Sequence, residues 1–212
     1  MENTLMLPDD AISTAALTFA KSNESAEIFN HSVRSYLFAK IYANHIKLIA
    51  DADYNDRLLL LACVLHDMGL TEKGDGDQRF EVDGADVAID FMKTKLMSSG
   101  DEDAVWQAIA LHTSGGIAER RGPIPLLTRA GIQMDFGGEL ALIVTTEQAR
   151  LIFDAYPRNK MATCLTDVIV AQIQRKPQKG VNYSLPKVTF DERNSGANSS
   201  MEERATKGRW GN

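Results

Sequence analysis

Hydrophobic positions recur along this chain with the 3.6-residue period of an α-helix rather than with the alternation of a strand. The clearest stretch is DRLLLLACVLHDM, residues 56–68, which is nearly apolar on all sides until Gly69. This pattern is typical of a helix buried in a bundle and ended by glycine. Weaker patterns predict helices over residues 11–21, 30–51, 83–97, 100–115, 145–156 and 161–175. The sequence therefore predicts an all-α fold, a compact bundle of about six to eight helices.

Capping and chain-breaking residues mark the ends of several of these helices. Asn30 is the predicted N-cap of the helix that carries His31. Thr145 and Gln148 have the spacing of a capping box, and Pro157 ends the helix that they begin. His31 is therefore expected in the first turn of a long helix.

Two segments rich in glycine and charge, one of them with prolines, separate the helices. Residues 71–80, TEKGDGDQRF, are expected to form a loop that could roof a site, and residues 120–138, RRGPIPLLTRAGIQMDFGG, are assigned no helix. From residue 177 the composition is polar, and we expect an extended or mobile tail. The prediction is one helical domain over residues 1–176, followed by a polar tail over residues 177–212.

The net charge and hydropathy of the chain limit the kinds of molecule that it is expected to bind. A chain of 212 residues with a net charge of −6 has no broad electrostatic attraction to nucleic acid or to an anionic membrane, although a small anionic substrate remains compatible. The sequence has no apolar run of membrane-span length and no basic signal-peptide start, so we expect a cytoplasmic protein. Cys63 and Cys164 are expected to be reduced core residues.

The chain has only four histidines, and three of them fall at predicted helix ends. His66 shares a helical stripe with Cys63, and His112 shares one with Ile109, so both imidazoles are expected to point inward. Imidazole is a good ligand for divalent transition metals. Each histidine alone is more simply explained as a hydrogen-bonded core imidazole or as a cation at a helix C-terminus than as a metal ligand.

The adjacent pair His66-Asp67 favours a metal ligand over a purely structural histidine. An aspartate buried after a leucine-rich helix is costly unless a metal or a cationic group compensates its charge. Adjacent helical residues point about 100° apart, so both can bind one ion only near a helix end. Gly69 allows that placement. The dyad therefore indicates a metal site or a buried ion pair.

The separated pattern His31, His66-Asp67 and Asp135 resembles the metal-binding set of the HD-domain superfamily of helical hydrolases. The resemblance spans roughly residues 28 to 160. Within the superfamily, several segments in the same order resemble the branch typified by cyanamide hydratase: HSVRSYLFA, LACVLHDMGLT, RFEVDGADVAIDF, VWQAIALHT, GIQMDFGG and AYPR.

The resemblance implies that His31, His66, Asp67 and Asp135 bind one divalent metal ion, with positions left open for water and substrate. Zn²⁺ is the expected ion, with Fe²⁺, Mn²⁺ or Ni²⁺ as alternatives. His45 lies about 20 Å from His31 along one helix and is expected at the surface or in packing.

Other residues are expected to act beside the metal. His112 is the remaining inward-facing histidine, and it either contacts substrate, shuttles a proton or serves as a structural imidazole. Asp67 is the alternative proton relay. Glu81 is expected near the pocket by resemblance, as a proton-handling carboxylate or hydrogen-bond acceptor, or else as a helix cap. Thr113 is expected to contact substrate, and Arg34 either binds an anionic group or pairs with an acid.

The remaining basic residues are expected to be solvated surface charges. They are Lys73, Arg79, Arg120 and Arg121.

The resemblance implies a hydratase in which the ion activates a water that attacks the nitrile carbon of cyanamide or a similar small nitrile, giving urea or an amide. An alternative with the same metal is an HD-type phosphohydrolase acting on a nucleotide or another small phosphate ester. A non-catalytic metal-binding module is a third reading. The substrate is expected to be a small molecule in each enzymatic case, and exposed apolar positions leave a homo-oligomer open.

Overall fold

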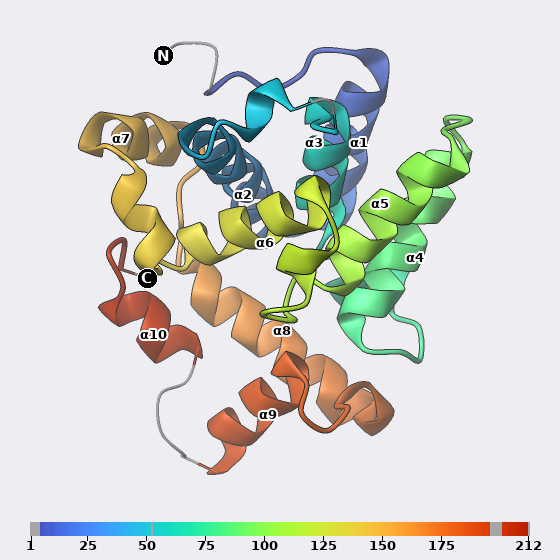
Figure 1. Cartoon of the computed structure of the whole chain (residues 1–212). Helices are drawn as coiled ribbons and strands as arrows, with labels where there is room; N and C mark the ends of the chain where they lie inside the picture. Colours follow the sequence, from blue (N-terminus) through green and yellow to red (C-terminus); the bar gives the residue numbers. More distant parts are fainter. Residues whose placement is uncertain (1–4, 52, 196–200, 212) are drawn as a thin grey trace.

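The computed structural model describes residues 5–51, 53–195 and 201–211, and Figure 1 shows their arrangement. The all-α prediction is confirmed, since the described residues form ten α-helices and no strand. This count is slightly above the expected six to eight. The helices are α1 Ala11–Asn23, α2 Ala26–His45, α3 Asp56–Leu65, α4 Phe80–Lys93, α5 Ser99–Ala110, α6 Pro123–Asp135, α7 Thr146–Ala155, α8 Met161–Arg175, α9 Leu185–Ser195 and α10 Met201–Lys207.

Helix α3 is the centre of the fold, as its sequence predicts. Every residue from Leu58 to Leu65 is buried, and α3 packs against α1, α2, α4, α5 and α6. The helix is short because His66 is its C-cap and a 3₁₀ turn, Met68–Leu70, follows. The His66-Asp67 dyad is therefore held at the inner end of the most buried element.

Helix α2 begins earlier than its sequence suggests. Ser25 is the N-cap, and its hydroxyl accepts a hydrogen bond from the backbone N–H of Ile28 at 3.3 Å. The predicted cap, Asn30, lies inside the helix, and its side-chain amide donates to the carbonyl oxygen of Pro157 at 3.0 Å. His31 therefore lies in the second turn of α2, deep in the fold, rather than in the first.

Helix α6 occupies the segment to which the sequence assigned no helix. Pro123 stands at its first position and Pro125 in its first turn, where a missing N–H and a fixed φ favour a helix. Gly131 lies at the contact with α2, where an added Cβ would come 2.1 Å from the backbone oxygen of Ser35. This close approach sets α6 against α2 and carries Asp135, the last residue of α6, to the site.

Two predicted helices match the structure closely. The capping box of Thr145 and Gln148 is present at the start of α7, and α8 runs from Met161 to Arg175 as its pattern predicts. In the described part of the chain, no helix is both long and apolar enough to cross a bilayer.

The segment after residue 177, expected to be extended or mobile, instead forms α9 and α10, which lie along α8 (Figure 1). Lys179 is fully buried and ion-paired with Asp83. Trp210 stacks on Phe38 with ring centroids 6.1 Å apart and donates from its indole N–H to the carbonyl of Met134 at 2.8 Å. The expectation was wrong because a few anchoring side chains hold this otherwise polar segment in place.

Candidate metal centre

The turn that carries His66 and Asp67 is fixed by glycine contacts with α4. A Cβ on Gly69 would lie 1.9 Å from the carbonyl oxygen of Phe80, and one on Gly84 would lie 2.9 Å from the Gly69 nitrogen. The backbone of α4 thus packs directly on the turn, with no room for side chains between them. This contact holds the dyad in a defined orientation.

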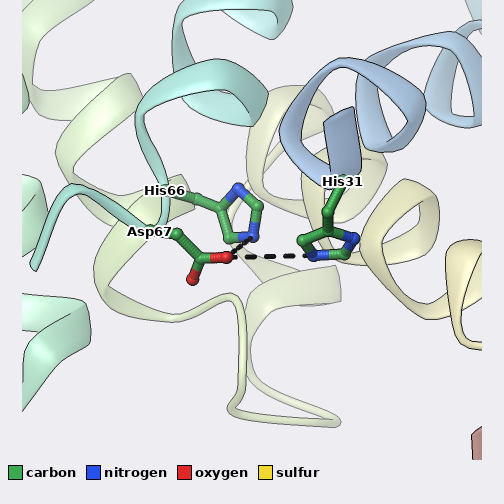
Figure 2. Close-up of side chains that lie close together, drawn as sticks. All are labelled: His31, His66 and Asp67. Atoms are coloured by element: carbon green, nitrogen blue, oxygen red, sulfur yellow. Dashed lines mark ion pairs between the residues drawn. The ribbon is translucent and has the colours of Figure 1, made fainter. Parts of the chain in front are cut away.

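Three side chains converge at this turn, as Figure 2 shows. His31 comes from α2, and His66 and Asp67 come from the end of α3 and the residue after it. Oδ2 of Asp67 lies 3.2 Å from Nε2 of His66 and 3.9 Å from Nε2 of His31. One donor atom from each residue lies within 4.8 Å of the others, and all three residues are buried. Three of the four predicted ligands are therefore brought together.

The hydrogen bonds of the three buried histidines determine which ring nitrogen carries the proton. Nδ1 of His66 lies 2.7 Å from the carbonyl oxygen of Cys63, and Nδ1 of His112 lies 2.7 Å from that of Ile109. Nδ1 of His31 lies 2.6 Å from Oδ2 of Asp135. These acceptors require each Nδ1 to carry the proton, which leaves the lone pair on Nε2.

The residues present fit a bound cation. Oδ2 of Asp67 is buried and makes no hydrogen bond, although it faces two imidazole nitrogens. Burial alone would raise the pKa of Asp67, but the neighbouring imidazoles of His66 and His31 lower it to about 2, so it is a carboxylate. Two nitrogen lone pairs and an unpaired carboxylate oxygen are suitable ligands for a divalent transition metal.

Asp135 lies behind His31, on the Nδ1 side of the ring. Arg34 donates to both of its carboxylate oxygens, from Nε at 2.9 Å and from Nη2 at 2.8 Å. Burial would raise the pKa of Asp135, but Arg34 and His31 hold it well below its usual range. This is the position of a carboxylate that orients a ligand histidine. Direct binding of the ion by Asp135 stays a prediction.

His112 lies beside the three-residue cluster, as expected for a residue outside a mononuclear set. Its ring centroid is 5.0 Å from that of His66, and the rings meet edge to face. Burial and the neighbouring His66 imidazole lower the pKa of His112 to about 4. The ring is therefore neutral at neutral pH, with a free lone pair on Nε2.

Glu81 belongs to a buried network at the edge of the site. It is fully buried and accepts hydrogen bonds from Oγ1 of Thr113 at 2.7 Å and from Nη2 of Arg79 at 2.5 Å. These partners favour the acceptor role over the helix-cap alternative. The expectation that Arg79 is a solvated surface charge was wrong, because Glu81 and Thr113 bind its guanidinium.

The three-residue cluster and His112 face a cavity of about 580 Å³. The polar side chains at one end of it are His31, His66, Asp67, His112 and Thr113. Much of the remaining wall is apolar and comes from α6, α8, the start of α9 and the 3₁₀ turn Glu139–Ile143.

Comparison with known proteins relates this cluster of histidines and aspartate to a family of helical proteins. The family model of the HD domain matches residues 28–172, more than half of the chain. The chain belongs to the HD-domain family. This HD protein is also similar to cyanamide hydratases DDI2 and DDI3 of Saccharomyces cerevisiae, each 24% identical to it over 184 residues, which cover 81% of this chain and 78% of the relative. The resemblance seen in the sequence is thereby confirmed, and it supports a metal-dependent HD enzyme.

Of the two roles left open for Arg34 in this HD protein, the structure shows the ion pair. Its side chain is fully buried, and Nη1 donates to the carbonyl oxygens of Tyr156 and Pro157 at 3.0 Å each. His45, the histidine expected outside the site, is exposed at the far end of α2.

The sequence did not single out two residues near the HD centre, Arg158 and Glu24. Arg158 donates from Nη1 to Oδ1 of Asp135 at 3.0 Å and also to its carbonyl oxygen. Its position in the AYPR segment was a usable signal. Glu24, at the C-terminal end of α1, has both carboxylate oxygens buried without a hydrogen bond, and burial together with Asp67 raises its pKa well above the usual value. No feature of the sequence marks Glu24.

Proposed function

We propose that this protein is a metal-dependent hydratase that adds water to the nitrile carbon of cyanamide or a similar small nitrile, giving urea or an amide. One observation carries the choice of a neutral substrate: the arginines near the cavity are already bound to protein acceptors. The family and the similarity to cyanamide hydratases support the same reaction class.

The charge around the site favours a neutral substrate over a phosphate ester. Arg34 and Arg158 are ion-paired with Asp135, and Arg79 is ion-paired with Glu81. Nε and Nη2 of Arg158 make no hydrogen bond, but Arg158 does not line the cavity. Arg129 is the one cationic side chain among the described residues that line the cavity, and it donates to Oε1 of Glu119 at 2.7 Å and to the carbonyl of His112 at 2.8 Å. A phosphate dianion entering this cavity would need free cationic donors to replace its hydration.

His31, His66 and Asp67 would hold the ion, with Asp135 orienting His31. We propose Zn²⁺, because two imidazoles and carboxylates form a common zinc ligand set, and Fe²⁺, Mn²⁺ and Ni²⁺ are the alternatives. When bound, such an ion supplies a water of lowered pKa and a Lewis acid for the nitrile nitrogen.

The residues beside the ligands handle the proton. Hydration forms a C–O bond at the nitrile carbon and moves the protons of one water to the nitrile nitrogen, with no oxidation or reduction. Nε2 of His112 is a neutral acceptor that can take a proton from water and return it to nitrogen. The Thr113 hydroxyl donates to Glu81 at 2.7 Å and lines the cavity, which supports a role in orienting the substrate amino group or the attacking water.

The test is urea formation by the purified protein loaded with Zn²⁺ and supplied with cyanamide. His112→Gln should retain the metal but lose at least about 100-fold in kcat, in the range of general acid–base contributions. The exposed-site variant His45→Gln should match wild type in both respects. Absence of urea at any cyanamide concentration would overturn the proposal.

The alternative inside the same family is a phosphohydrolase. A panel of deoxynucleotides, a phosphodiester and a chromogenic phosphate ester tests it directly. The proposed hydratase leaves all of them intact, so hydrolysis of any one that is lost in His66→Ala would favour the alternative.

A further inference from the structure

We propose that the substrate carries an apolar substituent next to its electrophilic group, so that an N-substituted cyanamide or organic nitrile fits this site better than cyanamide itself. The inference rests on the proposed hydratase function and names its substrate class. It arises from an apolar part of the cavity that the ligand cluster and His112 do not use. We call this part the apolar chamber, formed by Phe136, Leu140, Leu165, Ile169 and Leu185.

The size of the cavity exceeds what cyanamide needs. Cyanamide has three heavy atoms, which take up about 90 Å³ at the roughly 30 Å³ that one water molecule occupies in the liquid. The cavity has a volume of about 580 Å³, which is within the range of sites that enclose much larger ligands. A bare cyanamide at the metal would leave most of the apolar chamber filled with water.

The chamber begins directly beside the metal ligands. The ring of Phe136 meets that of His31 edge to face, with centroids 5.4 Å apart, and Phe80 meets His112 in the same way at 5.6 Å. One aromatic ring thus contacts a ligand histidine, and the other contacts His112. Both rings line the cavity, so a substituent on a nitrile held at the ligands would meet an apolar wall next to the cluster.

The outer wall of the chamber comes from three different elements. Leu165 and Ile169 are one turn apart on the same face of α8, and both are buried with 3% of their surface exposed. Leu140 faces the cavity from the 3₁₀ turn, and Leu185 is the first residue of α9. Leu185 lies beyond residue 172, where the match to the HD domain ends. The chamber is therefore completed by a segment outside the part of the chain that the family shares.

The chemistry of these walls selects an apolar neutral group. The five chamber residues offer no hydrogen-bond donor or acceptor from their side chains, so a polar substituent would lose its hydration without replacement. Each methylene group transferred from water into such a wall favours binding roughly fourfold. For an N-substituted cyanamide, water adds across the nitrile so that R–NH–CN and H₂O become R–NH–CO–NH₂, with every atom conserved.

Two measurements on the metal-loaded protein test the substrate class. Calorimetry compares the affinity of phenylurea, the product analogue with an apolar group, with that of urea. Kinetics compares kcat/KM for phenylcyanamide with kcat/KM for cyanamide. We expect both comparisons to favour the phenyl compound by at least about tenfold, because its ring adds several buried carbons.

Variants locate the effect in the chamber. Ile169→Trp fills the space from α8 and should reduce both phenyl-to-parent ratios at least about tenfold, while Leu185→Trp does the same from α9 if the first variant folds poorly. Val188→Trp is the matched control, since Val188 lies on α9, 43% exposed, outside the cavity lining. It should keep both ratios at the wild-type value.

The outcomes separate this inference from the proposed function. If phenylurea binds more tightly than urea but neither cyanamide is hydrated, the chamber assignment stands and the hydratase proposal fails. If cyanamide is hydrated but phenylurea and phenylcyanamide show no advantage, the hydratase proposal stands and the inference is overturned. The inference is also overturned if Ile169→Trp and Leu185→Trp both leave the ratios unchanged.

Discussion

Arg34 and Asp135 form a buried two-point ion pair that joins α2 to the end of α6. Nε and Nη2 of Arg34 each donate to a different carboxylate oxygen, at 2.9 and 2.8 Å, and neither side chain is exposed. The same carboxylate accepts from Nδ1 of His31. The pair therefore fixes the ring of a metal-ligand histidine that is more than a hundred residues away in sequence from Asp135.

Asp135→Asn should weaken metal binding without abolishing it. The amide can still accept from His31, but it no longer raises the basicity of the ring, and such a change typically costs about 10- to 100-fold in metal affinity. Competition against a chromophoric chelator measures the affinity. Asp154→Asn, on the exposed face of α7, is the control and should bind metal like wild type. A loss far beyond 100-fold would show instead that Asp135 binds the ion directly.

The ligand cluster predicts a site for one ion that depends on His66. Wild type should hold one Zn²⁺ per chain by elemental analysis, and His66→Ala should hold none after dialysis, because Asp67 and His31 alone make a poor site. His112→Gln should keep one ion, since His112 lies outside the three-residue cluster. Two ions per wild-type chain would contradict the mononuclear assignment.

Removing the metal should destabilise the wild-type protein. An ion that binds only the folded state stabilises it by about 2.7 kcal/mol at a free concentration 100 times Kd. Chelation should therefore lower the wild-type thermal midpoint by several degrees, and added Zn²⁺ should restore it. His66→Ala should show no response to either treatment. An equal response of the variant would mean that the stabilising ion binds elsewhere.

The sequence predicted the central helix and the burial of the His66-Asp67 pair because both depend on residues that are close together in the chain. A run of leucines needs burial on all sides, so His66 and Asp67, which follow it directly, had to lie inside the fold. The helix ends at Leu65, before the glycine expected to stop it, which lies in the next 3₁₀ turn. Helix α6 was missed because Pro123 and Gly131 are usually helix breakers. Here the proline stands at the first position of the helix, and the glycine serves a close helix contact.

The partners of the site residues were harder to predict than the residues themselves. Arg34 and Asp135 are brought together by the α2–α6 contact, and nothing local to either residue specifies that contact. Lys179 is similar, because its polar neighbours suggest solvent while the fold places it against Asp83. Ion pairs between residues far apart in the sequence depend on which helices pack together. Hydrophobic periodicity predicts the helices but not their packing partners.

Gly131→Ala should destabilise the fold and disturb the site. Its Cβ would lie 2.1 Å from a backbone oxygen of α2, so α2 and α6 must separate. We expect a loss of about 1–3 kcal/mol in the free energy of unfolding in urea, together with weaker metal binding as Asp135 moves. Gly100→Ala, in the first turn of α5, is the control, because its Cβ would have one neighbour, at 3.9 Å, and the change should be neutral or stabilising. Equal effects of both would contradict the packing argument.

Lys179→Met should show that the segment after α8 stabilises the fold around the site. Lys179 is fully buried, and its ammonium group binds Asp83 and the carbonyl of Gly76, so its loss leaves a buried carboxylate without a cation. Removing one partner of such a pair typically costs about 3–5 kcal/mol, measurable by urea unfolding. The exposed pair of Lys187 and Asp191 gives the matched control, and Lys187→Met should cost less than about 1 kcal/mol.

The double variant Lys179→Met/Asp83→Leu separates a charge effect from a packing effect. Since replacing both members of a buried pair with apolar groups is often close to neutral, most of the lost free energy should return. Recovery would mean that the unpaired Asp83 carboxylate causes the loss in Lys179→Met. If the double variant is as unstable as Lys179→Met alone, the lysine instead acts through its contact with the Gly76 carbonyl, and the loop before α4 depends on that hydrogen bond.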